Sequence, residues 1–250
     1  MSSQARSERI EEKRNLILRF LREEIWSDPK CLGELLQVKP AATYRTLAGL
    51  VEEGLLRSAQ IPMVGGHIGL WGITTHGQAM AAMPGEEVFE KAFSPSRVSP
   101  RYVQHILDIQ RLRILAEHSG WSQWVNADRI EKWAEGQPRP DAYATSTAGE
   151  RIAVECERTI KSPKRYGGIL NAWLQAIRRN EVQRVAWVSP DTRIRDRLQQ
   201  IICGITHIDV AGQSVLIPRD RFEKLSFLTY QEWPGQASFQ PIFVSEVSNG

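Results

Sequence analysis

The chain has 250 residues, of which 42% are hydrophobic and 24% charged, with a formal net charge of +3. This composition is typical of a globular protein and excludes a disordered or fibrous chain, and the length is sufficient for two domains with separate cores. The mildly basic isoelectric point near 8.8 permits a nucleic-acid partner without requiring one.

The number and spacing of the cysteines and the absence of long apolar runs indicate in which cellular compartment the protein is expected. Three scattered cysteines give neither a metal-ligand spacing nor an even set for disulfides, as expected in a reducing environment. The N-terminus lacks the apolar segment of a signal peptide, and no apolar run is long enough to span a membrane. We therefore expect a cytoplasmic protein without a membrane span.

The first third of the chain alternates between helix and turn signals. Ser27-Asp28-Pro29 is typical of the end of one helix and the N-cap of the next. Gly54 suits a helix C-cap, and Val64-Gly65-Gly66 suits a hairpin turn. The pattern predicts helices over 8–26, 31–36, 41–53 and 74–80, and strands over 55–62 and 67–73.

This order of elements, with Glu52-Glu53-Gly54-Leu55-Leu56 and Gly72-Ile73-Thr74-Thr75-His76-Gly77, resembles the winged helix-turn-helix family over residues 8–82. In that family the third helix enters the major groove of DNA. The resemblance implies contacts to bases from the start of that helix and from the wing, at Thr43, Tyr44, Arg45 and His67. A winged helix used only for protein interaction is the alternative.

A segment rich in Pro, Gly and Ser over 83–99 predicts a domain boundary, with a short helical patch at 88–93. The expected organisation is a DNA-binding domain over 1–82, a linker over 83–99, a second domain over 100–233 and an irregular tail over 234–250. The second domain opens with an apolar helix over 100–119, in which His105 and Asp108 lie one turn apart. A His at such a position is more often a core-edge side chain than a catalyst, and we give His105 only a supporting role.

The second domain alternates between strand and helix patterns. Strands are expected over 121–126, 141–145, 152–157, 182–189, 207–210 and 215–217, and helices over 162–179 and 192–202. The simplest arrangement is an α/β fold with a central mixed sheet flanked by helices on both faces.

The residues that carry chemistry gather around one expected hairpin. Asp141 and Glu155 are separated by a turn-rich segment, which places them at neighbouring strand ends. Glu157 lies on the same strand face as Glu155 by period-two alternation. Carboxylates on one face repel unless a cation compensates them, and Mg²⁺ or Mn²⁺ with substrate phosphates would use such ligands. Lys161 and Lys164 follow and can stabilise charge on phosphorus.

One observation extends this site, and one alternative opposes it. The helix after the expected strand carries Arg165, Arg178 and Arg179 with almost no acid to balance them, with Arg184 just beyond, which indicates a phosphate track along that helix. The alternative is that Asp141 and Glu155 are ordinary surface carboxylates.

Pro140-Asp141, the Glu155-x-Glu157 strand and the downstream lysines resemble the restriction-endonuclease-like PD-(D/E)xK superfamily. That family has a Lys two residues after the second acid, where this chain has Glu157, so Lys161 or Lys164 would take its role. Together with the winged helix and the run from Lys161 to Tyr166, most of the chain resembles the MobC-type relaxases and replication-relaxation proteins of mobilisable plasmids.

The resemblance implies a metal-dependent enzyme that nicks double-stranded DNA at a plasmid transfer origin and holds the nicked strand. It also implies a coupling protein or another relaxosome component as partner. Tyr143 and Tyr166 leave a covalent tyrosine route open. The competing interpretation is a DNA-binding regulator or relaxosome accessory protein whose nuclease-like domain is inactive.

Overall fold

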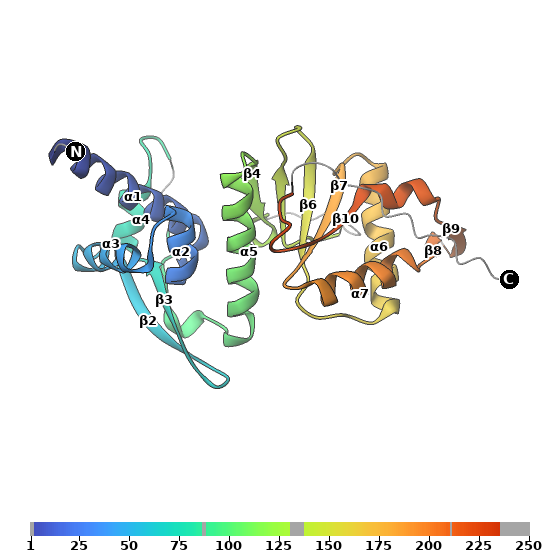
Figure 1. The fold of residues 1–250 in the computed structure, drawn as a ribbon, viewed down its shortest axis with the longest axis horizontal. Helices are drawn as coiled ribbons and strands as arrows, with labels where there is room; N and C mark the ends of the chain where they lie inside the picture. Colours follow the sequence, from blue (N-terminus) through green and yellow to red (C-terminus); the bar gives the residue numbers. More distant parts are fainter. Residues whose placement is uncertain (1–2, 87–88, 131–137, 211, 236–250) are drawn as a thin grey trace. The chain divides into compact units, whose positions relative to one another are not determined.

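The computed structural model describes residues 3–86, 89–130, 138–210 and 212–235 (Figure 1). The chain divides into two compact units, residues 1–114 and residues 115–250. Both units mix helices with sheet, as the α/β prediction requires. No helix among the described residues combines the length and the apolar character needed to cross a membrane.

The first unit consists of helices around a small antiparallel sheet of strand order β1-β3-β2. Its elements are α1 (Ser3–Glu24), β1 (Trp26–Ser27), α2 (Pro29–Leu36), α3 (Pro40–Glu52), β2 (Leu56–Met63), β3 (Gly66–Ile73), α4 (Thr75–Ala81) and most of α5 (Pro100–His118). The expected helices and strands of this region are present, and β1 is an addition that pairs with β3.

Local sequence signals set the bounds of these elements. The side chain of Asp28 accepts a hydrogen bond of 2.7 Å from the backbone N–H of Cys31, which caps α2 as predicted. Thr74 caps α4 in the same way, with 2.9 Å to the N–H of Gly77. Gly54 after α3 and Gly65 in the hairpin turn have positive φ values of 73° and 84°, which glycine adopts without strain.

The segment expected to be a linker packs on the first unit. The N–H of Phe93 donates to the carbonyl of Ile73 at 2.8 Å, and a Cβ at Gly72 would come within 2.2 Å of the Phe93 side chain. Of the predicted helical patch, residues 89–93 are not helical, so the prediction is wrong there, and residue 88 lies outside the described residues. Within the described part of the segment, the one helical element is a 3-10 turn at Pro95–Arg97.

The second unit is built on a five-stranded mixed sheet of order β10-β7-β6-β5-β4. Strands β4, β5 and β6 are antiparallel neighbours, whereas β6, β7 and β10 run parallel. The strands are β4 (Ser122–Asn126), β5 (Ala142–Thr145), β6 (Arg151–Cys156), β7 (Arg184–Ser189) and β10 (Leu225–Thr229). The sequence patterns did not predict β10.

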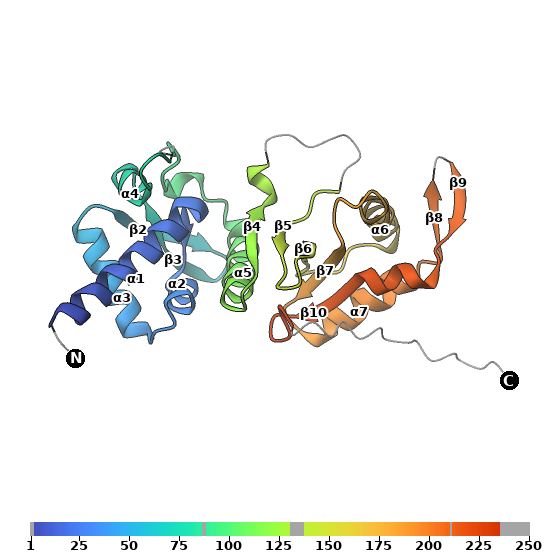
Figure 2. The ribbon, with the colours of Figure 1, turned by 90° about the horizontal axis from the view of Figure 1, so that it is seen from above.

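The predicted strands β8 (His207–Val210) and β9 (Gln213–Leu216) do form, but as a separate two-stranded sheet (Figure 2). Helices α6 (Pro163–Arg178) and α7 (Thr192–Cys203) pack on one face of the five-stranded sheet (Figures 1 and 2). Trp173, Trp187 and Leu198 lie in the core between them. Because side chains alternate along a strand, Ala153 and Glu155 of β6 face this helical layer.

Candidate functional site

The hairpin of β5 and β6 brings Asp141 and Glu155 opposite each other. Ala142 pairs with Val154, so Asp141, immediately before β5, falls at the next position of the ladder, beside Glu155. The backbone N–H of Asp141 donates to the carbonyl of Val154 at 3.0 Å. Its carboxylate accepts a hydrogen bond of 2.7 Å from the backbone N–H of Cys156. These two bonds fix both the backbone and the side chain of Asp141 against β6.

Glu155 is held in a partly buried environment under α6. Its Oε1 accepts a hydrogen bond of 2.9 Å from Nε1 of Trp173. Burial, and then the negative charge of Asp141, raise the pKa of Glu155 to about 8, although the Trp173 bond and the charge of Lys161 act against this rise. A carboxyl group with such a raised pKa gains from a cation placed beside it, and perturbed pairs of this kind gather at functional sites.

The two carboxylates fit a hard divalent cation. Mg²⁺ is commonly held by one or two protein carboxylates, with water and substrate phosphate oxygens as the remaining ligands. Asp141 and Glu155 supply that set from two adjacent strands. Among the described residues, no group of three or more His, Cys, Asp or Glu side chains is arranged to hold a metal ion. A cation at this place would therefore have this pair as its protein ligands, with water or substrate oxygens completing the set.

Glu157 does not join Asp141 and Glu155 as a third ligand, which corrects the sequence-based assignment. Its side chain is buried, with 4% of the residue exposed. Its Oε2 accepts a hydrogen bond from Nζ of Lys161 and another of 3.0 Å from the hydroxyl of Tyr166. Glu155 and Glu157 share a strand face as predicted, but Glu157 lies one step further, where the loop after β6 and the start of α6 supply its partners.

The two candidate lysines occupy different environments. Lys161 forms an ion pair with Glu157, and its charge lowers the pKa of Glu155, so it lies close to both carboxylates. Lys164 is exposed in the first turn of α6, beside the exposed Arg165. Lys161 is therefore the lysine that the structure brings to the Asp141–Glu155 pair.

The remaining arginines of the expected phosphate track lie at the far end of α6 and beyond it. Arg178 is about 21 Å along the helix axis from Lys164, because an α-helix rises about 1.5 Å per residue, and its side chain is exposed. Arg179 is exposed but forms a salt bridge of 2.6 Å with Glu181. Arg184 begins β7 at the opposite end of the sheet and pairs with Glu150 at 3.1 Å. Glu181 and Glu150 thus balance Arg179 and Arg184, which the sequence pattern did not show, and phosphate contacts from Arg178 remain a prediction.

The two tyrosines differ in their access to a substrate. Tyr166 is buried. Its hydroxyl donates a hydrogen bond to Glu157 and accepts one of 3.0 Å from the backbone N–H of Lys161. Burial raises the pKa of this hydroxyl well above its usual range. Tyr143 lies two residues beyond Asp141 on β5, is partly exposed, and has the guanidinium of Arg151 4.4 Å from its ring centroid. Burial raises its pKa as well. Both hydroxyls are thus poorly disposed to ionise and attack phosphorus.

In the first unit, the residues assigned to base contacts separate into exposed and buried positions. Arg45 and His67 are exposed, and Tyr44 is 51% exposed with its ring edge-on to Trp71 at 5.7 Å. Thr43 is fully buried and points toward α2, where a Cβ on Gly33 would approach its Oγ1 to 2.9 Å. The prediction that Thr43 contacts a base is therefore wrong.

A cavity of about 540 Å³ lies between α2 and the start of α3. Lys30, Lys39 and Tyr44 are among the residues that line it.

His105, which we gave a supporting role, is partly buried on α5. Asp108 is 1% exposed, and its carboxylate accepts a hydrogen bond of 3.2 Å from the side-chain amide of Gln104. Asp108 also lies 3.9 Å from Arg111. These contacts belong to the first unit and lie outside the carboxylate site.

Sequence reasoning missed Trp173, which positions Glu155, and the clamp that Tyr166 forms with Glu157. The signal for Trp173 was its position on the apolar face of α6, which the hydrophobic periodicity already directed toward the sheet.

No protein-family model, curated protein or solved structure matches this chain.

Proposed function

We propose that this protein is a metal-dependent DNA endonuclease that nicks one strand. The observation that carries the proposal is the pair Asp141 and Glu155, which face each other across β5 and β6 with Lys161 close to Glu155. The order α5, β4, β5, β6, α6, β7 supports it, because a helix, three antiparallel strands, a helix and a parallel strand follow one another as in the restriction-endonuclease-like fold that the motifs resemble.

In this proposal each residue has a separate task. Asp141 and Glu155 would hold Mg²⁺ or Mn²⁺, which when bound polarises the phosphodiester and lowers the pKa of a bound water. The ammonium of Lys161 stabilises negative charge that builds on the phosphate oxygens. Lys164 and Arg165, exposed at the start of α6, bind phosphates that flank the cut.

We further propose that the substrate is double-stranded DNA at a plasmid transfer origin, as in the MobC-type relaxases that the chain resembles. The first unit, with helices α2 and α3 and the β2–β3 hairpin, would recognise the site as a winged helix does, through Tyr44, Arg45 and His67. Such a protein would retain the nicked strand and act with a coupling protein or another relaxosome component.

A nicking assay on supercoiled plasmid DNA tests the proposal. The plasmid carries a candidate transfer origin, and we expect Mg²⁺ or Mn²⁺ to produce open-circular DNA and a chelator to prevent it. Plasmid that stays supercoiled with either metal, while the protein binds the same DNA, would overturn the proposed activity.

One observation favours a second function, a DNA-binding regulator with an inactive nuclease-like unit. The lysine nearest the carboxylate pair is already engaged by Glu157, and the family's usual lysine position is occupied by that acid. Such a regulator would show sequence-specific binding in the assay above and no metal-dependent nick.

A further inference from the structure

The environment of Glu157 is distinct from that of the other two carboxylates of the site. Asp141 is bonded to the backbone of β6, and Glu155 to an indole N–H. Glu157 instead accepts from a cationic side chain four residues later and from a tyrosine hydroxyl. Its backbone N–H still donates to the carbonyl of Val188 at 2.9 Å, so the sheet fixes the direction in which this side chain leaves β6.

Glu157 and Tyr166 together hold Lys161 at two points. The carboxylate of Glu157 binds Nζ, while the hydroxyl of Tyr166 accepts 3.0 Å from the backbone N–H of Lys161 and donates to Glu157. The loop between β6 and α6 is thereby tied through both its backbone and its charged end. Glu157 comes two residues after Glu155, which is about 7 Å along an extended backbone, so the ammonium that Glu157 holds lies beside the carboxylate site.

We propose that Glu157 is a positioning residue that holds the ammonium of Lys161 beside Asp141 and Glu155, and that it is not a metal ligand. This inference rests on the nuclease function proposed above. The acid occupies the sequence position of the lysine in the Glu-x-Lys pattern, and it compensates by anchoring a lysine that comes later in the chain. Residues that orient a catalytic group in this way typically contribute about 10- to 100-fold to activity.

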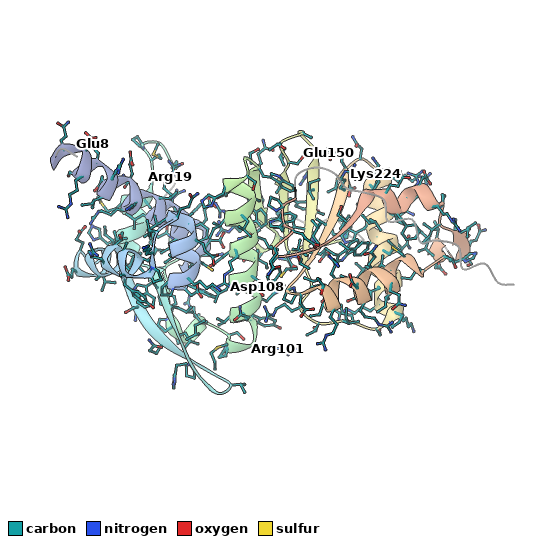
Figure 3. All side chains as sticks on the ribbon, viewed as in Figure 1. Glu8, Arg19, Arg101, Asp108, Glu150 and Lys224 are labelled. Atoms are coloured by element: carbon teal, nitrogen blue, oxygen red, sulfur yellow. The ribbon has the colours of Figure 1, made fainter. Side chains whose placement is uncertain are left out.

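Metal binding distinguishes a positioning role from a ligand role without any need for activity. Mn²⁺ alone is titrated into the wild type and into Glu157→Gln, Glu155→Gln and Glu150→Gln. Glu150, labelled in Figure 3, is the matched control, since it also pairs with a cation but lies at the turn of the hairpin, where its carbonyl accepts a hydrogen bond from the N–H of Ser146. We expect Glu157→Gln and Glu150→Gln to retain the wild-type Mn²⁺ affinity and Glu155→Gln to lose it. Equal losses in Glu157→Gln and Glu155→Gln would overturn the inference.

A double-mutant cycle tests whether Glu157 acts through Lys161. We expect Glu157→Gln to lower the kcat of nicking about 10- to 100-fold with little change in the KM for DNA. In a Lys161→Met background the same change should cost almost nothing, because the group it positions is already gone. Additive losses would show a role independent of Lys161 and would overturn the inference.

Acetylation of Lys161, followed by mass spectrometry with Lys164 as internal reference, provides a readout that remains usable if the wild type does not nick DNA. The ion pair with Glu157 should slow acetylation of Lys161 in the wild type, and Glu157→Gln should accelerate it. The same rate in both proteins would overturn the inference. A wild type without nicking but with this difference would overturn the nuclease proposal alone.

Discussion

At the scale of single residues, the site is a set of charges whose energies depend on one another. Asp141, Glu155 and Glu157 are three acids on one side of a hairpin, yet each has a different partner. A buried carboxylate is tolerated only where hydrogen bonds or an opposite charge compensate the loss of water. The charge of Lys161 compensates the buried Glu157. For Glu155, the Trp173 bond and the charge of Lys161 only partly offset burial and the charge of Asp141, so the pKa of Glu155 is raised.

Lys161 should be the catalytic lysine. We expect Lys161→Met to lower the nicking rate at saturating metal about 100-fold or more, as loss of a well-placed charge donor does. Lys164→Met, which removes an exposed cation on the first turn of α6, is the matched comparison and should have a smaller effect on kcat. Single-turnover nicking measures both. If both variants nick at the wild-type rate, no lysine serves the reaction.

The raised pKa of Glu155 predicts a pH-dependent stability of the metal-free protein. In an unfolded chain a glutamate titrates near pH 4.3, so between about pH 4.3 and 8 the folded state binds more protons. The free energy of unfolding should therefore fall as the pH rises through this interval. We expect a loss of about 3–4 kcal/mol between pH 5 and 8 in the wild type and a smaller one in Glu155→Gln.

Urea unfolding at the two pH values, in the presence of a chelator, measures this difference. Glu150→Gln serves as the control, because Glu150 is paired with Arg184 and should keep the wild-type pH dependence. The same pH dependence in wild type and Glu155→Gln would show that another group is responsible.

At the scale of elements, α3 has one face in the core and one in solvent. Leu47 and Leu50 are fully buried, and helical periodicity buries Thr43 with them. Tyr44 and Arg45 lie on the exposed side at the beginning of the helix. The exposed face at the start of α3 therefore includes Tyr44 and Arg45 but not Thr43.

Arg45→Ala should weaken specific DNA binding by about 1–3 kcal/mol and relax specificity at one position, if Arg45 contacts a base edge. Arg19→Ala removes an exposed cation from α1 of the same unit and is the control for loss of charge alone (Figure 3). Fluorescence anisotropy with specific and scrambled DNA measures both. An affinity unchanged by Arg45→Ala would favour a protein-interaction role for this unit.

At the scale of the whole molecule, the residues assigned to recognition and to chemistry belong to different compact units. Tyr44, Arg45 and His67 lie in the first unit, and Asp141, Glu155 and Lys161 lie in the second. Helix α5 (Pro100–His118) includes the point at which the chain divides, between residues 114 and 115.

This division predicts a separation of function. Asp141→Ala should abolish metal-dependent nicking and leave sequence-specific binding nearly unchanged, because Asp141 lies in the second unit and the residues assigned to base contacts lie in the first. Nicking and anisotropy assays on the same preparation measure the two properties. Relaxation of plasmid DNA by Asp141→Ala at the wild-type rate would refute the metal-site assignment.

The sequence by itself determined the features that depend on neighbouring residues. Caps and turns at Asp28, Gly54 and Thr74 placed the ends of the helices, because each acts on backbone groups within a few residues. The approach of Asp141 to Glu155 was equally predictable, since a hairpin joins strands that are close in the chain.

Only the tertiary structure decided the features that depend on distant segments. Strand β10 forms through parallel pairing with β7, which lies far away in the sequence. The few residues of β10 do not predict a strand by their own pattern. Glu157 accepts a hydrogen bond from Tyr166 because the packing of α6 places the hydroxyl of Tyr166 beside the end of β6. The packing of Phe93 on Gly72 likewise made an apparent linker part of the first unit. In each case the deciding energy is burial between elements, which the local pattern of residues does not contain.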